Sequence, residues 1–221
     1  MRTMARSEWL LESPDTLPED EQKPAYLPAK RAFDVIFCLV ILFPVAIVAV
    51  LCALAVKLDT PGPVFYSQLR IGKDGRAFRM WKFRTMVENA EELKASLAHL
   101  NVLPPPDFKI PDDPRVTRAG KFLRKTSLDE LPQFVNVLKG DMSIVGPRPA
   151  EDGMDTYKLW YGERLEVPPG ITGIWQLEGR AAISFDARLR YDLEYIRTMS
   201  LWTDIKLIAR TIGVVFKGTG V

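Results

Sequence analysis

Two adjacent carboxylates, Asp129 and Glu130, are the residues of this 221-residue chain whose types and spacing best suit chemistry. Arg148 follows them between Pro147 and Pro149, which restrict the backbone on both sides of the arginine. Basic residues precede the two acids at helical spacing: Arg118, Lys121, Arg124 and Lys125. Because cations around a helix N-terminus suit a phosphate group, we predict a phosphate-binding site in this stretch.

A purely structural interpretation of the two acids is also open. Ser127 and Glu130 have the spacing of a capping box, and Pro132 is tolerated in the first turn of a helix. The pattern therefore predicts a helix that begins near Asp129 and ends at about Lys139. In that interpretation the two acids only complement the helix dipole.

Few reactions are open to two carboxylates beside a phosphate. They repel the phosphate unless one of them attacks the phosphorus or both are neutralised by a divalent cation such as Mg²⁺. The single histidine, His99, excludes a histidine metal cluster, and Cys38 and Cys52 lie in one apolar run that gives no support to a thiolate site. Arg180, in a segment punctuated by Gly and Pro, is a further candidate phosphate ligand.

A long apolar run must place these residues relative to a membrane. Val35 to Val56 carries no charge and is long enough to cross a bilayer, but Pro44 lies near its middle and cations flank both ends: Lys30, Arg31 and Lys57. We predict a re-entrant helix-break-helix over residues 30–57 that enters and leaves one leaflet, with a kinked span as the alternative. Asp34 is expected to pair with a basic neighbour such as Arg31.

The remaining patterns predict the other elements. Residues 64–71 and 77–84 are rich in aromatic and β-prone residues and flank a Gly-Lys-Asp-Gly turn, which predicts a β-hairpin. An amphipathic helix with a core face is expected from Met86 to Leu100, followed by a proline-rich loop over 104–114. Helices are expected over 185–198 and 201–217, and the second has a composition that suits a membrane surface.

Length and composition bound the organisation of the chain. With 221 residues, 47% hydrophobic content and a net charge of +2, it fits one domain with an appendage. The proline- and acid-rich residues 1–29 indicate a mobile arm rather than a secretory signal. We therefore predict a mostly helical α+β protein with an arm (1–29), a re-entrant membrane segment (30–57) and a domain at the cytoplasmic face (58–221).

A series of motifs follows in order along the chain: KRAFD at 30–34, LDTPGPVFYSQLRIG at 58–72, FRMWKFRTM at 78–86, DPRVTRAGKFLRKTSLDELPQ at 113–133, GDMSIVGPRP at 140–149, PGITGIWQ at 169–176, and then YDLEYI and SLWTDIKL. Together these motifs resemble the bacterial monotopic phosphoglycosyl transferases, the sugar transferase family that starts exopolysaccharide, O-antigen and capsule assembly. The resemblance covers residues 30–221.

The resemblance implies a reaction and a place in the cell. It implies transfer of a sugar phosphate from a UDP-sugar to undecaprenyl phosphate, with release of UMP, at the cytoplasmic face of the bacterial inner membrane. The family's Asp-Glu pair falls on Asp129, as the nucleophile on the β-phosphate, and on Glu130, which is associated with Mg²⁺. The family's nucleotide-handling motif falls on Pro147, Arg148 and Pro149.

Two other functions remain open at this stage. Asp129 and Glu130 could bind metal only, with transfer in a single step through a ternary complex. Alternatively, the protein is a non-catalytic membrane scaffold that binds lipid through its basic face. We expect membrane lipids as partners and no nucleic acid, and the sequence leaves open which sugar is used and whether two copies form a homodimer.

Overall fold

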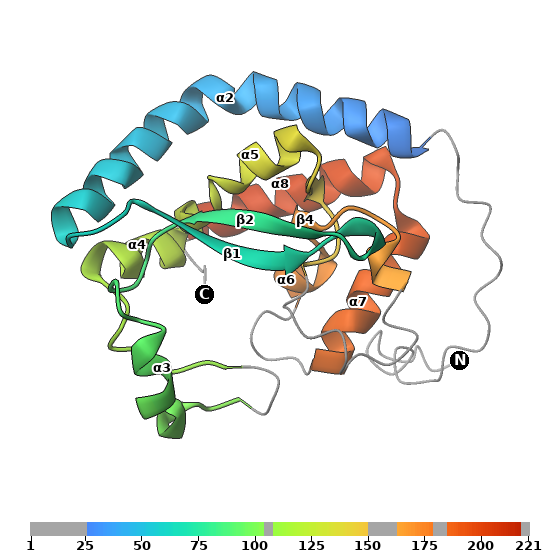
Figure 1. Cartoon of the computed structure of the whole chain (residues 1–221). Coiled ribbons are helices and arrows are strands. Elements are labelled where there is room, and N and C mark those ends of the chain that lie inside the picture. The colour runs from blue at the N-terminus through green and yellow to red at the C-terminus, as the bar shows by residue number, and fades with distance from the viewer. Residues whose placement is uncertain (1–25, 104–107, 150–162, 179–184, 218–221) are drawn as a thin grey trace.

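The structure, a computed structural model, describes residues 26–103, 108–149, 163–178 and 185–217 (Figure 1). The elements follow in the order α2 (Tyr26–Asp59), β1 (Phe65–Ile71), η1 (Lys73–Gly75), β2 (Ala77–Phe83), α3 (Glu92–Ser96), η2 (Ala98–Leu100), α4 (Arg118–Thr126), η3 (Leu128–Glu130), α5 (Gln133–Lys139), β3 (Ser143–Val145), β4 (Gly170–Thr172), α6 (Ile174–Glu178), α7 (Phe185–Thr198) and α8 (Leu201–Lys217). The predicted hairpin and the two predicted C-terminal helices are confirmed.

Helix α2 is one unbroken helix that curves over the rest of the domain (Figure 1). The predicted break at Pro44 is absent, because a proline removes one backbone hydrogen bond and bends a helix without ending it when the flanking residues stay helical. Among the described residues, α2 is the helix long and apolar enough to cross a membrane. It begins at Tyr26, so residues 26–29 belong to the helix; the rest of the predicted arm lies outside the described residues.

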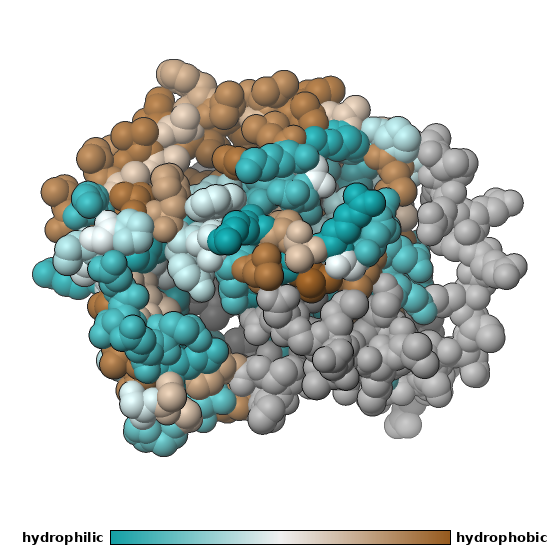
Figure 2. Space-filling model, viewed as in Figure 1, coloured by the Kyte–Doolittle hydropathy of each residue, from teal (hydrophilic) through white to brown (hydrophobic). Residues whose placement is uncertain are grey.

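Both ends of α2 pack against the same body, while its middle does not. Near the start, Cys38 joins the main hydrophobic core. Near the end, Cys52 and Val56 pack with Phe83 of β2 and Leu123 of α4. Between these anchors large apolar side chains point outward, and they form the hydrophobic band along α2 in Figure 2: Leu39, Val40, Phe43, Ile47, Val50 and Leu51.

Buried polar contacts fix the first turns of α2. Lys30 lies 2.8 Å from Asp204 of α8, and Asp34 accepts hydrogen bonds from the Ser143 hydroxyl at 2.7 Å and the Ile144 N–H at 3.3 Å. The predicted pairing of Asp34 with a basic neighbour is confirmed, but the neighbour is Lys30, at 3.9 Å, and not Arg31. Arg31 instead donates to the Val137 and Leu138 carbonyl oxygens at the end of α5, where a helix leaves its last carbonyl groups unsatisfied.

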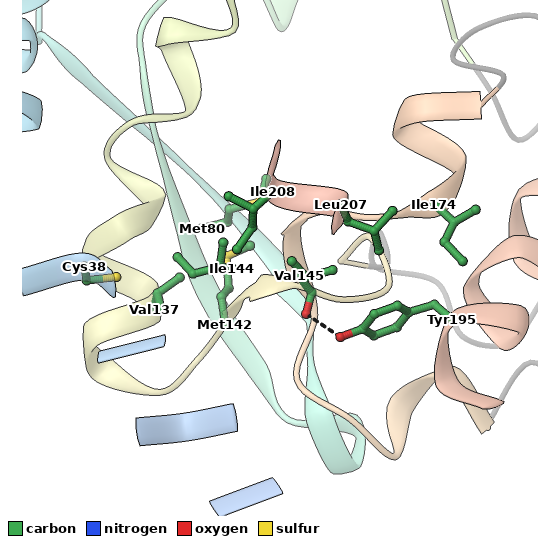
Figure 3. Packing of buried hydrophobic residues seen from close by; sticks show 10 residues of the cluster. All are labelled: Cys38, Met80, Val137, Met142, Ile144, Val145, Ile174, Tyr195, Leu207 and Ile208. Carbon is green, nitrogen blue, oxygen red and sulfur yellow. Dashed lines mark hydrogen bonds between the residues drawn. The ribbon is translucent and has the colours of Figure 1, made fainter. Parts of the chain in front are cut away.

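Two small sheets and the helices α5, α6, α7 and α8 form most of the body. Strands β1 and β2 pair antiparallel, and the short strands β3 and β4 pair in parallel. Side chains from α2, β2, α5, β3, α6, α7 and α8 form the main core (Figure 3). Within it the Tyr195 hydroxyl donates to the Val145 carbonyl oxygen at 3.1 Å. The core thus supports β3 and the turn that follows it.

The segment from Met86 to Leu100 differs from the predicted amphipathic helix. Its helical part is reduced to the short elements α3 and η2, and neither contains a buried residue. In Figure 1 α3 lies away from the body, and the leucines expected on a core face, Leu93, Leu97 and Leu100, are not buried.

Candidate active site

Asp129 and Glu130 lie in the short turn η3 between two helices. Ser127, which precedes this turn, has a left-handed backbone (φ 58°) and closes α4 rather than opening the next helix. Its side chain makes no capping hydrogen bond, so the alternative interpretation of Ser127 and Glu130 as a capping box is wrong. Helix α5 starts only at Gln133, after Pro132, and ends at Lys139 as predicted. For a residue other than glycine, a left-handed backbone costs about 1 kcal/mol. At Ser127 this conformation turns both acids back toward the β1–β2 hairpin.

Glu130 is held by two cations. Lys82 of β2 lies 2.8 Å from its Oε1 atom and Arg148 lies 3.9 Å from the same atom, and 22% of the Glu130 side chain is exposed. Burial opposes ionisation of Glu130, but Lys82, Arg148 and hydrogen bonds from Lys82 and Gln133 outweigh it and hold its pKa below the usual range. Glu130 is therefore a carboxylate at neutral pH.

Asp129 has a different environment from its neighbour. It is buried, at 9% exposure. Burial and then the nearby Glu130 carboxylate raise the pKa of Asp129 to about 6, although Lys82 and Arg124 act in the opposite direction. Asp129 thus remains mostly ionised at neutral pH but is a more basic oxygen nucleophile than an ordinary aspartate.

Arg148 is presented by a turn that two strands hold in place. The Gly146 N–H donates to the Thr172 carbonyl oxygen at 2.9 Å, and the Gly170 N–H donates to the Pro147 carbonyl oxygen at 2.8 Å. Gly146 and Gly170 approach so closely that a Cβ on Gly170 would lie 2.0 Å from the Gly146 nitrogen. This contact places Arg148 beside Glu130, with 40% of its side chain exposed.

A buried ion pair holds the backbone of Arg148. Arg164 lies 3.0 Å from Asp192 of α7 and also donates to the Arg148 carbonyl oxygen. The Arg148 N–H bonds to the Asp192 carboxylate. Burial raises the pKa of Asp192 to about 7, against the opposing effects of Arg164 and of the Arg148 N–H. Both polar backbone groups of Arg148 are therefore fixed by the same pair of side chains.

Comparison with known proteins identifies the family. The model of the family described as bacterial sugar transferase matches residues 25–218. The chain belongs to this family. It is 46% identical over 200 residues to the galactosyl transferase CpsE of Streptococcus agalactiae, and 41% identical over 196 residues to the undecaprenyl-phosphate galactose phosphotransferase of Salmonella typhimurium.

The alignments cover different shares of the length of these relatives. The two alignments cover 90% and 86% of this chain but 44% and 41% of the two relatives, so the chain spans less than half the length of these relatives. The exopolysaccharide production protein ExoY of Rhizobium meliloti is 38% identical over 219 residues, and that alignment covers 94% of this chain and 95% of ExoY.

The basic residues predicted around Asp129 and Glu130 differ in how close they lie to these acids. Arg124 is half-buried, donates to the Thr85 hydroxyl at 2.9 Å and acts electrostatically on Asp129. Arg118 and Lys125 are exposed on α4, and within the described ranges no hydrogen bond or ion pair joins them to either acid. Arg180 lies outside the described residues.

The donor set of this site fits Mg²⁺ only together with a substrate. In the described part of the chain no three His, Cys, Asp or Glu side chains converge on one point. Mg²⁺ is commonly held by one or two carboxylates, with phosphate oxygens and water completing the shell. Asp129 and Glu130 supply those two carboxylates, so they fit a cation that a diphosphate shares.

Sequence reasoning missed three residues of this site: Lys82, Arg164 and Asp192. Lys82 had a detectable signal, since it belongs to a predicted hairpin that carries several basic residues beside its aromatic ones, but nothing distinguished it from the other basic residues there. Arg164 and Asp192 approach Arg148 only through the packing of α7 against the turn, and no spacing in the sequence shows that contact.

Proposed function

We propose that this protein transfers a sugar 1-phosphate from a UDP-sugar to undecaprenyl phosphate and releases UMP, as the first step of exopolysaccharide, O-antigen or capsule synthesis. The observation that carries the proposal is the Asp129–Glu130 turn among Lys82, Arg124 and Arg148. Two carboxylates among three cations suit a diphosphate and a group that attacks it. The printed names of relatives support the substrates: one is a UDP-glucose:undecaprenyl-phosphate glucose-1-phosphate transferase of Escherichia coli.

The reaction divides into two displacements at phosphorus. A carboxylate oxygen of Asp129 attacks the β-phosphorus, the bond from that phosphorus to the bridging oxygen breaks, and UMP leaves with the bond's electron pair. A phosphate oxygen of undecaprenyl phosphate then attacks the same phosphorus, the acyl phosphate bond breaks, and the Asp129 carboxylate is regenerated. The covalent intermediate separates two bulky anions that would otherwise have to meet in one step.

The different environments of the two acids support Asp129 as the nucleophile. Glu130 is engaged by Lys82 and Arg148, whereas the same lysine and Arg124 act on Asp129 through longer-range attraction. Neighbouring residues on a helical turn also point in different directions, so only one carboxylate can lie in line with the leaving UMP. Glu130 and Asp129 would hold Mg²⁺, which when bound neutralises charge that develops on the diphosphate.

The packing of α2 supports a membrane anchor that enters and leaves one leaflet. Both ends of this helix contact the same body, and its exposed middle is apolar. A helix that crossed the bilayer would have to place its two ends on opposite sides, away from one common domain. We therefore place the whole protein at the cytoplasmic face of the inner membrane, where the lipid phosphate is within reach.

An assay of UMP release tests the proposed function. The purified protein would be supplied with Mg²⁺, undecaprenyl phosphate and, in turn, UDP-glucose, UDP-galactose and UDP-N-acetylgalactosamine. We expect UMP with at least one sugar nucleotide and loss of UMP formation in Asp129→Asn. Lipid binding without UMP from any of these substrates would favour the non-catalytic scaffold instead.

A further inference from the structure

Two arginines lie against one tryptophan ring beside the proposed active site. The guanidinium carbon of Arg148 lies 5.6 Å from the centre of the Trp175 ring, and that of Arg188 lies 5.5 Å from it. Trp175 belongs to α6 and Arg188 to α7, and these two helices pack against each other. Arg148 and Arg188 are both partly exposed, so a solute can reach these two residues.

A tryptophan ring orients a guanidinium group without removing its charge. The attraction uses the face of the ring and the plane of the guanidinium, so the N–H donors at the edge of that plane still point outward. An arginine held in this way loses little side-chain freedom when it binds a phosphate with two parallel hydrogen bonds. Trp175 thus holds two guanidinium groups at one place.

The carboxylates near this pair already have cationic partners. Asp192 acts on both Arg148 and Arg188, but it forms its ion pair with Arg164 at 3.0 Å. Glu130, which faces Arg148, is paired with Lys82 at 2.8 Å. The described charges around the Trp175 ring therefore favour an additional anion rather than another cation.

We propose that Arg188 binds a substrate phosphate together with Arg148, across the ring of Trp175. The inference rests on the proposed function, because Arg148 reaches Glu130 and hence the place where the diphosphate is expected. The phosphate has two sources, the diphosphate of the UDP-sugar or the phosphate of the lipid acceptor, and the chemistry of recognition is the same for both.

Calorimetric titration with UDP, followed by two half-reactions, tests the proposal in the full-length protein. Loss of a charge-assisted contact in Arg188→Gln should weaken UDP binding by about tenfold or more. Arg197→Gln, a charge change at an exposed position of the same helix, is the matched control and should change UDP binding by less than about twofold. If UDP binding is normal in Arg188→Gln but the enzyme loaded with sugar phosphate transfers slowly to undecaprenyl phosphate, the lipid phosphate is the ligand.

Normal UDP binding together with normal rates in both half-reactions of Arg188→Gln would overturn the proposal. If that variant does not fold, Arg188→Lys decides: a lysine keeps the charge but loses the fork, so wild-type values for both ligands would show that Arg188 is structural. UMP release by the wild-type protein is measured first, because its absence would overturn the proposed function, whereas UDP binding tests Arg188 without turnover.

Discussion

Asp129 and Glu130 are neighbours in the chain, yet their carboxylates differ in pKa because their surroundings differ. Lys82 contacts Glu130 directly and keeps it ionised, while burial makes the Asp129 carboxyl group harder to ionise. The sequence could predict that two acids and Arg148 form one site. It could not predict the difference in pKa between the two acids, because Lys82, the cation that contacts Glu130, belongs to β2, which is distant in the chain.

The raised pKa of Asp129 predicts opposite effects of pH on rate and on stability. In the proposed reaction the ionised form of Asp129 attacks phosphorus, so the rate of UMP release at low UDP-sugar should rise with pH through about 6 and then level off. The folded state binds this proton more tightly than the unfolded chain does, so ionisation of Asp129 lowers stability as pH rises from 3.8 to about 6.

Initial rates and thermal unfolding between about pH 4 and pH 8 would check both effects. Asp129→Asn is the control for the second effect, because the loss of stability that is due to this group should disappear in the variant. A rate of UMP release that does not change with pH across about 5 to 7 would contradict the assignment of Asp129 as nucleophile.

Among the elements, those with strong local patterns were predictable and those fixed by distant contacts were not. The turn between β1 and β2 and the periodicity of α7 and α8 specified these elements, and the structure confirms them. The predicted start of α5 was wrong because Ser127 closes α4 with a left-handed backbone. A serine in the sequence does not indicate that conformation. Asp34 has the basic neighbour that was expected, Lys30 rather than Arg31, but its hydrogen bonds come from β3, which is remote in sequence and could not be predicted.

The contact between α7 and the Arg148 turn predicts that Asp192 is a positioning residue. In Asp192→Asn the amide cannot keep the ion pair with Arg164, so the Arg148 backbone loses part of its support. We expect the KM for UDP-sugar to rise by several-fold to about tenfold, less than in Arg148→Ala.

A double-mutant cycle separates positioning from a general loss of structure. If Asp192 acts through Arg148, adding Asp192→Asn to Arg148→Ala should change the KM little further, and Asp192→Glu should restore part of the effect. Fully additive effects on KM, with a lowered melting temperature in each single variant, would assign Asp192 to stability alone.

At the scale of the whole molecule, the proposed membrane anchor makes the curved path of α2 decide where the site lies relative to the bilayer. In a variant with Cys38 and Cys52 replaced by alanine, a single new cysteine within residues 1–25 should resist a membrane-impermeant thiol reagent in intact cells. Pro44→Ala should favour a straight helix and increase labelling from outside. Ready labelling from outside of the protein that keeps Pro44 would establish a full membrane span and contradict the proposed anchor.

The proposed requirement for a divalent cation concerns the protein together with its substrate. Asp129 and Glu130 offer too few ligands to hold Mg²⁺ tightly alone, so EDTA should abolish turnover and added Mg²⁺ should restore it at once. The melting temperature without substrate should stay within about one or two degrees on removal of the metal, since no binding energy is then lost. Full turnover in excess chelator would exclude the metal from the reaction.

The covalent intermediate is the central claim, and it is tested by giving the enzyme a UDP-sugar without any lipid acceptor. We predict a burst of UMP of about one equivalent and, by mass spectrometry, a sugar phosphate on the peptide that contains Asp129. Asp129→Asn should give neither signal while remaining folded, because the amide keeps the side-chain volume. UMP that appears only after undecaprenyl phosphate is added, with no modified peptide, would contradict the account and favour transfer in a single step.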